Sequence, residues 1–376
     1  MNAFPSYGDW MPMAFELPAY REPDFSDPLL LQAPDVRWAR ADAPGVAPRG
    51  FHSTSMHPEY LKIDGAWQLV RDMAMDDVIR RRPDGRIDVV PERVLRADDE
   101  VALGRAEDGS EGVLVWPHGF DAGEERSADA FAFRSARSRE TSYARDYDRL
   151  MELLAYEREH GNVLWVMGPA FSFDADARAA MQRLVEGGYV HGVLAGNALA
   201  THDLEGALLH TALGQDIYTQ QSVELGHYNH LDVINEVRRS GSIPQFIDDH
   251  DITDGIMYAL VRKGVPFSLA GSIRDDGPLP EVEADVYAAQ GQMYELICKA
   301  TTIVCMATML HTIATGNLAG SYCVTDDGTV RPKYFYAVDA NEFPLNKLHD
   351  RGSLAATTIV ANACDFIHLI ARGLGA

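Results

Sequence analysis

Residues 264–280 read Gly264-Val-Pro-Phe-Ser-Leu-Ala-Gly-Ser-Ile-Arg-Asp-Asp-Gly-Pro-Leu-Pro280, an apolar run followed by a polar turn. The apolar part, 266–270, predicts a buried strand that stops at Gly271. The polar side chains of the turn are those of Ser272, Arg274, Asp275 and Asp276. A strand that ends in charged residues flanked by glycine is typical of the carboxyl edge of an open parallel sheet, where ligands bind. Taken alone, the turn is equally compatible with a solvated surface loop.

Strands and helices alternate from about residue 140 to the C-terminus. Apolar runs predict strands at 162–167, 189–194, 266–270, 301–306 and 334–338. Periodic patterns predict helices at 139–159, 174–186, 203–211, 230–239, 255–262, 283–300 and 353–372. This alternation predicts an α/β fold, in which residues 140–376 form a Rossmann-like, doubly wound parallel sheet.

The N-terminal third of the chain has a different pattern. In residues 51–125, short apolar segments are separated by Asp-Gly pairs at 64–65, 84–85 and 108–109. Asp-Gly between such segments favours β-hairpins, so we expect a small β-rich domain there. Residues 1–50 are rich in proline, aspartate and alanine and lack periodicity. They predict an extended arm that either wraps a partner subunit or stays loose.

The composition restricts the classes of partner. The chain has 376 residues, with 33 basic and 56 acidic side chains and a net charge of −23. This balance argues against nucleic acid and anionic membranes as partners, because both prefer a basic surface. Four cysteines without a CxxC pair indicate free thiols in a reducing, cytoplasmic compartment. The longest apolar run, 301–319, is interrupted by threonines, a histidine and an asparagine, and predicts buried structure instead of a membrane span.

Several predicted strands end in turns that suit a dinucleotide. Glycine lets the backbone approach a ligand, and a helix N-terminus offers free N–H groups to phosphate. The residues at these strand ends are Gly168, Pro169, Gly196, Asn197, Gly271 and Ser272. Asp339 and Asn341 follow a late strand and suit the hydroxyls of a ribose, although Asn341 would equally suit a helix N-cap. None of these turns matches GxGxxG, so the usual Rossmann fingerprint is absent.

The histidines do not predict a metal site. His227 and His230 are spaced to share a helical face, but no third ligand stands at a suitable spacing. His52, His57 and His118 are scattered through the β-rich region without a ligand pattern. We therefore expect no catalytic metal. P-loop, GxSxG and HExxH motifs are also absent.

About 200 residues from Trp165 onward resemble the LOR/SDH conserved-domain family, which includes ornithine cyclodeaminases of the archaeal and cyanobacterial type. The resemblance rests on the 264–280 block and on Leu194-Ala-Gly-Asn-Ala-Leu-Ala-Thr-His-Asp203, Gly226-His-Tyr-Asn-His230 and Val338-Asp-Ala-Asn341. It also includes Ala307-Thr-Met-Leu-His311 with Gly316-Asn317. The N-terminal half resembles the first domain of this family more loosely.

The resemblance implies an NAD-binding domain of the deoxyhypusine synthase type and conversion of L-ornithine to L-proline with loss of ammonia. Through this resemblance, Asn317 is also expected to contact the cofactor. Hydride removal and return at the amine-bearing carbon require a carboxylate anchor and acid/base groups. Arg274 suits the substrate carboxylate, with Asn197 and His311 as further substrate contacts. The acid/base candidates are Asp275, Asp276, His202 and Asp203. For Lys347 we leave a cofactor-phosphate role and a structural role open.

Two alternatives remain at this point. The same fold and cofactor could act on lysine or another diamino acid or amine, and a dinucleotide-binding protein without catalysis could share the pattern. We also expect the substrate to be a small amino acid. We expect the protein to form a homo-oligomer, either a dimer or a tetramer.

Overall fold

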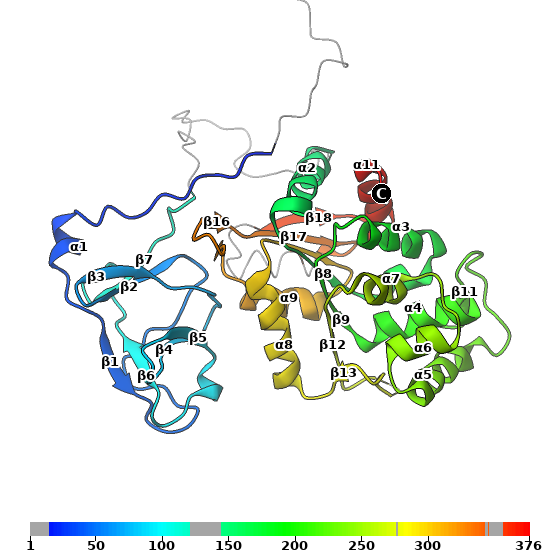
Figure 1. Ribbon diagram of the computed structural model, residues 1–376, viewed down its shortest axis with the longest axis horizontal. Helices are drawn as coiled ribbons and strands as arrows, with labels where there is room; N and C mark the ends of the chain where they lie inside the picture. Colours follow the sequence, from blue (N-terminus) through cyan, green and yellow to red (C-terminus); the bar gives the residue numbers. More distant parts are fainter. Residues whose placement is uncertain (1–14, 121–143, 276, 343–344, 346–355) are drawn as a thin grey trace, which may run out of the picture.

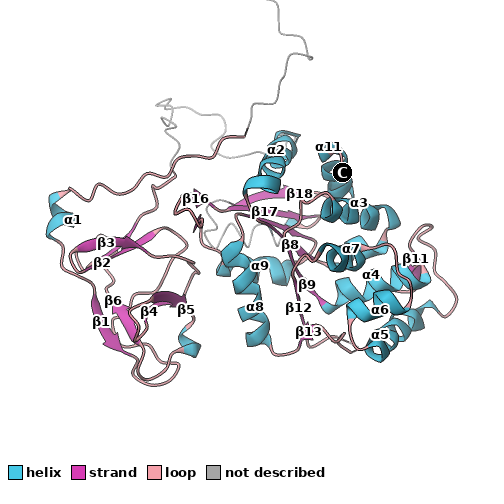
Figure 2. Ribbon diagram, in the orientation of Figure 1, coloured by secondary structure: helices cyan, strands magenta, loops and turns pink. Residues whose placement is uncertain are grey.

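A computed structural model describes residues 15–120, 144–275, 277–342, 345 and 356–376. Figure 1 shows a small β-rich part, which contains the N-terminal strands, beside a larger α/β part that extends to the C-terminus. The expected fold class is confirmed: a parallel sheet forms the larger part, and antiparallel sheets form the smaller one (Figure 2).

The smaller part contains two antiparallel sheets. One has the order β1-β6-β4-β5 and the other β3-β2-β7. Their bounds are β1 Arg37–Arg40, β2 Glu59–Ile63, β3 Ala66–Leu69, β4 Val78–Arg81, β5 Ile87–Val90, β6 Glu100–Leu103 and β7 Val113–Val115, with α1 Pro28–Gln32 and η1 Glu92–Val94 beside them. Asp64 and Gly65 join β2 to β3 with φ angles of 51° and 80°, as a tight hairpin of the expected kind requires.

The described part of the N-terminal arm, residues 15–50, packs against other segments of the same molecule. β1 pairs with β6, so a boundary at residue 50 would cut through a sheet. The Lys62 ammonium donates to the carbonyls of Leu30, Leu31 and Ala33 at 2.8–3.1 Å. Phe15 packs against the rings of Tyr156 and Tyr334 in the larger part. The partners in these contacts are distant in sequence. The composition and periodicity of residues 1–50 alone therefore could not predict them.

The larger part is built on a seven-stranded parallel sheet with the order β13-β12-β9-β8-β14-β17-β18. Its strands are β8 Val163–Met167, β9 Gly192–Gly196, β12 Phe267–Ala270, β13 Val282–Glu283, β14 Thr302–Met306, β17 Tyr334–Asp339 and β18 Ala356–Val360. Without the short edge strand β13, this is the strand order of a doubly wound Rossmann fold. The central strands β8 and β14 are fully buried and apolar except for Thr302, as a sheet covered on both faces requires.

Helices cover both faces of the sheet (Figures 1 and 2). On one face lie α2 Ala144–His160, α3 Ala175–Glu186, α7 Ile256–Lys263 and α11 Ala363–Leu374. On the other lie α8 Val286–Lys299 and α9 Met309–Leu318. Between β9 and α7 the chain inserts α4 Asn197–Leu209, η3 Gly226–Tyr228, α5 Asn229–Ser240 and α6 Ile243–Asp249, with the hairpin β10 Thr211–Ala212 and β11 Gln215–Asp216. The remaining elements are η2 Pro169–Phe173, β15 Tyr322–Val324 and β16 Val330–Pro332.

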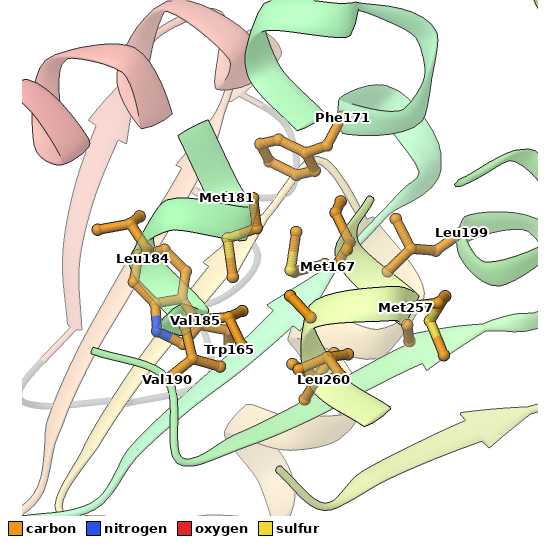
Figure 3. Close-up of a cluster of buried hydrophobic side chains, with 14 of the residues drawn as sticks. Trp165, Met167, Phe171, Met181, Leu184, Val185, Val190, Leu199, Met257 and Leu260 are labelled. Atoms are coloured by element: carbon orange, nitrogen blue, oxygen red, sulfur yellow. The ribbon is translucent and has the colours of Figure 1, made fainter. Parts of the chain in front are cut away.

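The main core lies between the sheet and the α3–α7 layer. In Figure 3, Trp165 and Met167 of β8 pack against Met181 of α3 and Leu260 of α7, with Phe171 of η2 above them. All five side chains are inaccessible to solvent. The buried indole of Trp165 donates to the carbonyl of Tyr189 at 2.9 Å, so its polar group has a partner. This packing fixes the position of β8, whose carboxyl end enters the candidate site.

The C-terminal region differs from its expected helix over 353–372. Residues Ala356–Val360 form the edge strand β18, and α11 begins only at Ala363, after the N-cap Asn362. Four consecutive residues, 357–360, are β-branched, which favours a strand. Likewise, α4 begins six residues before the expected 203, and β4, β13 and α6 were not predicted.

The two parts of the molecule are joined by backbone hydrogen bonds. Met75 N–H donates to the Asn317 carbonyl at 2.9 Å, and Ser321 N–H donates to the Met56 carbonyl at 2.8 Å. Gly320 lies so close to Met73 that an added Cβ would stand 2.8 Å from the Met73 Cβ. The C-terminal end of α9 therefore contacts the N-terminal domain directly. Among the described helices, none is both long and apolar enough to cross a membrane.

Candidate active site

The carboxyl ends of β8 and β14 form the switch point of the sheet, because the chain leaves these neighbouring strands toward opposite edges. Gly168 follows β8, and its N–H donates to the Met306 carbonyl at 2.9 Å. A Cβ at this position would stand 1.9 Å from the Ala307 carbonyl oxygen. Glycine is therefore required where the two chain segments leave the strand ends in close contact.

Three helical segments begin at this edge: η2 after Gly168, α4 after Gly196, and α9 after Thr308. In the described part of the chain, the N-cap residues Gly168, Gly196 and Thr308 make no side-chain capping bond to these N-termini. Their first N–H groups are thus available to an anionic group, and the helix dipoles of α4 and α9 favour negative charge. Pro169 occupies the first position of η2, where its missing N–H has no cost.

The turn after β12 is held by its own side chains. The Asp275 carboxylate accepts from the Ser272 N–H at 2.6 Å and from the Ser272 hydroxyl at 2.9 Å. Gly271 continues the sheet, because its N–H donates to the Glu283 carbonyl at 2.8 Å. The Arg274 side chain is exposed, whereas Asp276 lies outside the described residues. The turn thus presents a fixed carboxylate beside a guanidinium that is open to solvent.

His311 brings the separate strand ends together. It lies in the first turn of α9, and its Cε1 is 3.3 Å from where a Gly196 Cβ would stand. Burial lowers the pKa of His311 below its ordinary value, while the negative charge of Asp275 acts in the opposite direction. Burial thus favours the neutral form of the imidazole, which lies against the end of β9 and within electrostatic reach of Asp275.

Asn197 fixes the second half of this turn. Its side-chain oxygen accepts from the Leu279 N–H at 3.1 Å, and its amide donates to the Gly277 carbonyl at 3.3 Å. The side chain is nearly buried, with 5% exposure. Both ends of the amide are therefore used within the protein, and Asn197 positions the turn against the start of α4. These two bonds use only part of the hydrogen-bonding capacity of the side chain, because an amide nitrogen carries two N–H groups.

His202 and Asp203 are adjacent in sequence but serve different partners. The Asp203 carboxylate is fully buried and accepts from Arg178 Nε at 2.8 Å and from the N–H groups of Ile256 and Met257 at 3.0 and 2.7 Å. It binds the first N–H groups of α7 and neutralises a buried arginine, so these contacts hold helices together, and the acid/base role of Asp203 stays a prediction.

The carboxylate partner of His202 is Glu205, which the sequence reasoning did not single out. His202 Nδ1 lies 2.8 Å from Glu205 Oε2, and the buried Glu205 also accepts from the Thr211 hydroxyl at 2.8 Å. The i, i+3 spacing of a histidine and a glutamate on a helix was the available signal.

The remaining expected cofactor residues separate into two locations. Asp339 ends β17 at the same edge as Gly168, and its Oδ1 accepts from the Asn341 N–H at 2.8 Å. Asn317 lies in the last turn of α9, roughly 12 Å along the helix from its start. There its carbonyl binds Met75 of the N-terminal domain. Asn317 therefore lies away from the strand ends, and Lys347 is outside the described residues.

Within the part of the chain that the structure describes, no group of three or more His, Cys, Asp or Glu side chains is arranged to hold a metal ion. His227 belongs to η3, and His230 lies in the first turn of α5, with its ring 5.9 Å from that of His202. Both lie in the insertion between β9 and α7.

Comparison with known proteins places this geometry in a family. Residues 149–370 match the family model described as arginine dihydrolase ArgZ-like, C-terminal, Rossmann fold. An ornithine cyclodeaminase of Methanopyrus kandleri is 38% identical over 342 residues, which cover 90% of this chain and 78% of that protein. The chain belongs to the ornithine cyclodeaminase family. The resemblance inferred from the sequence is thus confirmed.

Other members of the ornithine cyclodeaminase family extend the comparison. The enzyme of Archaeoglobus fulgidus is 39% identical over 89% of this chain and 78% of its own length. The bifunctional arginine dihydrolase/ornithine cyclodeaminase ArgZ of Synechocystis is 33% identical over 90% of this chain, which spans only 47% of that protein. A crystal structure of a putative LOR/SDH protein from Methanococcus maripaludis superposes with a TM-score of 0.81 at 31% identity, covering 91% of this chain and 98% of that one.

A ternary complex of AgrE with ornithine and NAD⁺ also superposes, with a TM-score of 0.56 at 30% identity over 92% of this chain and 46% of that one.

Proposed function

We propose that this chain converts L-ornithine to L-proline and ammonia with NAD⁺ as an internal hydride carrier. Archaeal relatives at 33–39% identity are named ornithine cyclodeaminases, and AgrE has been solved with ornithine and NAD⁺. The observation that carries the proposal is the contact of His311 with the end of β9 at Gly196, at the edge of the sheet where α4 and α9 begin and within electrostatic reach of Asp275. The four free cysteines agree with a cytoplasmic location, which forms part of the proposal.

The residues at this edge fit a dinucleotide. The N-termini of α4 and α9 would take its phosphates, and Gly168 and Gly196 allow a close approach of the backbone. Asp339 would accept from ribose hydroxyls, with Asn341 beside it. When bound, NAD⁺ would accept the hydride from Cα of ornithine and return it to the same carbon after ring closure, so the reaction has no net oxidation.

The turn after β12 would hold the substrate. Arg274 is exposed and suits the α-carboxylate, since a guanidinium binds a carboxylate with two hydrogen bonds. Asp275 would pair with the distal ammonium, accept its proton, and so release the amine that attacks the oxidised carbon. The neutral His311 would line this site as a hydrogen-bonding partner. Ammonia leaves as the ring closes, so ornithine yields one proline and one ammonia. We retain Asp276 as a second acid/base candidate.

Turnover of L-ornithine tests the proposal. With purified chain, NAD⁺ and L-ornithine, we expect equimolar proline and ammonia by mass spectrometry and an enzymatic ammonia assay. Omission of NAD⁺ after dialysis should lower the rate, and L-lysine at the same concentration should serve as the comparison substrate. Proline formation without ammonia, or no product from ornithine, would contradict the proposal. Faster ammonia release from lysine would instead redirect it to another diamino acid.

Asp339→Ala should weaken the binding of NAD⁺ by about 1–3 kcal/mol, because a ribose hydroxyl loses its charged acceptor. Isothermal titration calorimetry with NAD⁺ measures the change. Asp84→Ala is the matched control, since Asp84 also accepts from the N–H two residues on, but in the N-terminal domain. Equal affinities of the two variants would remove Asp339 from the cofactor site.

A further inference from the structure

A cavity of about 870 Å³ lies where the N-terminal domain meets the larger part of the molecule. Its volume is within the range of small-molecule sites, about 300–1,000 Å³. The lining residues fall in four segments, 71–72, 159–162, 295–301 and 323–326, of which the first belongs to the N-terminal domain. Figure 1 shows α8 and β16 on the side of the larger part that faces this domain. We refer to the hollow as the interdomain cavity.

The interdomain cavity lies at the edge of the sheet opposite the candidate active site. Asn162 and Thr301 line it, and they directly precede β8 and β14 at the amino ends of these strands. The candidate active site lies at the carboxyl ends. The five residues of β8 span about 17 Å at the rise of a parallel strand. A small molecule in the interdomain cavity would therefore occupy a separate place.

Charged side chains of both signs line the interdomain cavity and are available to a ligand. Among the described residues, five of them make no ion pair or side-chain hydrogen bond. They are the cations of Arg71 and Lys299 and the carboxylates of Asp72, Glu295 and Asp326. Carboxylates thus outnumber cations here, in a chain with a net charge of −23. This field favours a ligand with a negative group and more than one positive group.

The Asp72 carboxylate stands on a fixed backbone. Its φ angle is 55°, a left-handed conformation that aspartate adopts more readily than most residues. The Tyr294 hydroxyl of α8 donates to the Asp72 carbonyl. This hydrogen bond joins the two walls of the interdomain cavity, so the carboxylate of one domain keeps its place beside the charged groups of the other.

A buried lysine lies behind the cavity wall. The Lys333 side chain is 5% exposed, and its ammonium donates to the Ile297 carbonyl at 2.6 Å. No carboxylate of the described chain stands within ion-pair distance of it, although buried lysines usually have such a partner. Burial lowers the pKa of Lys333, and the groups within its electrostatic reach, Cys298, Cys323 and Asp72, all line the cavity. A carboxylate bound in the cavity would supply the missing counter-charge.

We propose that the interdomain cavity binds an α-amino acid with a cationic side chain. The α-carboxylate pairs with Arg71 and Lys299 in front of the buried ammonium, and the two cationic groups of the ligand pair with the carboxylates of the cavity. Such a ligand touches both domains at once, so its binding stabilises their contact. The proposal is independent of the proposed reaction, and its test requires no turnover.

Isothermal titration calorimetry of the full chain with L-arginine tests this site, with L-citrulline and agmatine as paired probes. L-Citrulline keeps the shape of L-arginine but lacks the charge of its side chain, and agmatine keeps the guanidinium but lacks the carboxylate. We expect L-arginine to bind, and each of the other two to bind about tenfold more weakly or less, because each leaves charged groups of the cavity unpaired. L-Arginine should also raise the melting temperature more than L-citrulline does.

Asp72→Asn and Lys299→Gln should each weaken the binding of L-arginine by about tenfold, because each removes a charged partner. Asp64→Asn is the control for the first, since Asp64 also has a left-handed φ angle, 51°, in the same domain. Lys263→Gln is the control for the second, since Lys263 ends α7 as Lys299 ends α8. Both controls should bind L-arginine as the parent does.

Absence of L-arginine binding overturns the proposal, and so does equal affinity for L-arginine and L-citrulline. Equal affinities of the cavity variants and their controls also overturn it, because L-arginine would then bind elsewhere, as at the candidate active site. If a cavity variant does not fold, Glu295→Gln replaces it, since Glu295 is exposed on α8. Weakened binding in that variant supports the site, and unchanged binding rejects it.

Discussion

Asp275→Asn is expected to lower the rate of ammonia release from ornithine by about 10²–10⁴-fold, the usual contribution of a positioned acid or base. The turn should survive the change. Asparagine keeps one oxygen for the Ser272 N–H, and the Ser272 hydroxyl can accept from the new amide, as it now donates to the carboxylate. The loss would therefore measure the charge and basicity of Asp275, with its placement retained.

The same variant should change the pH dependence. Asp275 partly offsets the effect of burial on His311, so its removal should lower the pKa of His311 further. If protonation of His311 causes the fall in rate on the acid side of the pH–rate profile, this fall should then occur at lower pH. A rate profile from pH 5 to 9 and a melting curve at pH 7 measure both effects.

Asp327→Asn is the control for Asp275→Asn. The Asp327 carboxylate also accepts from a neighbouring hydroxyl and a backbone N–H, those of Thr325 and Thr329, but in the β15–β16 turn. Its rate should equal that of the parent. If Asp275→Asn also stays within a few-fold of the parent, the turn after β12 is structural, and the catalytic carboxylate must be sought at Asp276.

Asp203→Asn is expected to lower the free energy of unfolding by about 3–5 kcal/mol, because it leaves the Arg178 guanidinium buried without its main counter-charge. The two side chains are 4% and 1% exposed, and Asp254 offers only a longer contact at 3.3 Å. The N–H groups of Ile256 and Met257 also lose part of their acceptor. Chemical denaturation followed by circular dichroism measures the change.

Asp248→Asn provides the comparison for Asp203→Asn, because the ion pair between Arg262 and Asp248 is exposed on both sides and contributes little to stability. The turnover of Asp203→Asn should stay near that of the parent when both are measured at a temperature at which this variant remains folded. A stable variant with turnover reduced a thousandfold would contradict a purely structural role and favour the acid/base role of Asp203.

The sheet was predictable because its central strands are short apolar runs between glycines and helices. The runs at 162–167, 301–306 and 334–338 correspond closely to β8, β14 and β17. Parallel strands bring their carboxyl ends to one edge, so the sequence also predicted that Gly168 and the 271–275 turn share an edge. The terminal strand β18 was missed because its apolar residues also fitted a helical pattern that continues into α11.

The details of the site were less accessible, because they depend on contacts between distant segments. No residue near Asp203 in the sequence predicts that its carboxylate binds Arg178 and the start of α7. Asn197 read as a ligand contact, yet its amide holds the loop some 80 residues later, at Gly277 and Leu279. A polar residue at a strand end thus predicts the location of a site more reliably than it predicts which side chains face the ligand.

Helix α9 links two places that are far apart in the fold. Its first turn carries His311 at the strand ends, and its last turn offers the Asn317 carbonyl to Met75 of the N-terminal domain. A straight helix of ten residues behaves as a stiff rod, so a tilt at one end displaces the other. The same ten residues therefore set both the position of His311 at the strand ends and the position of the carbonyl that binds the N-terminal domain.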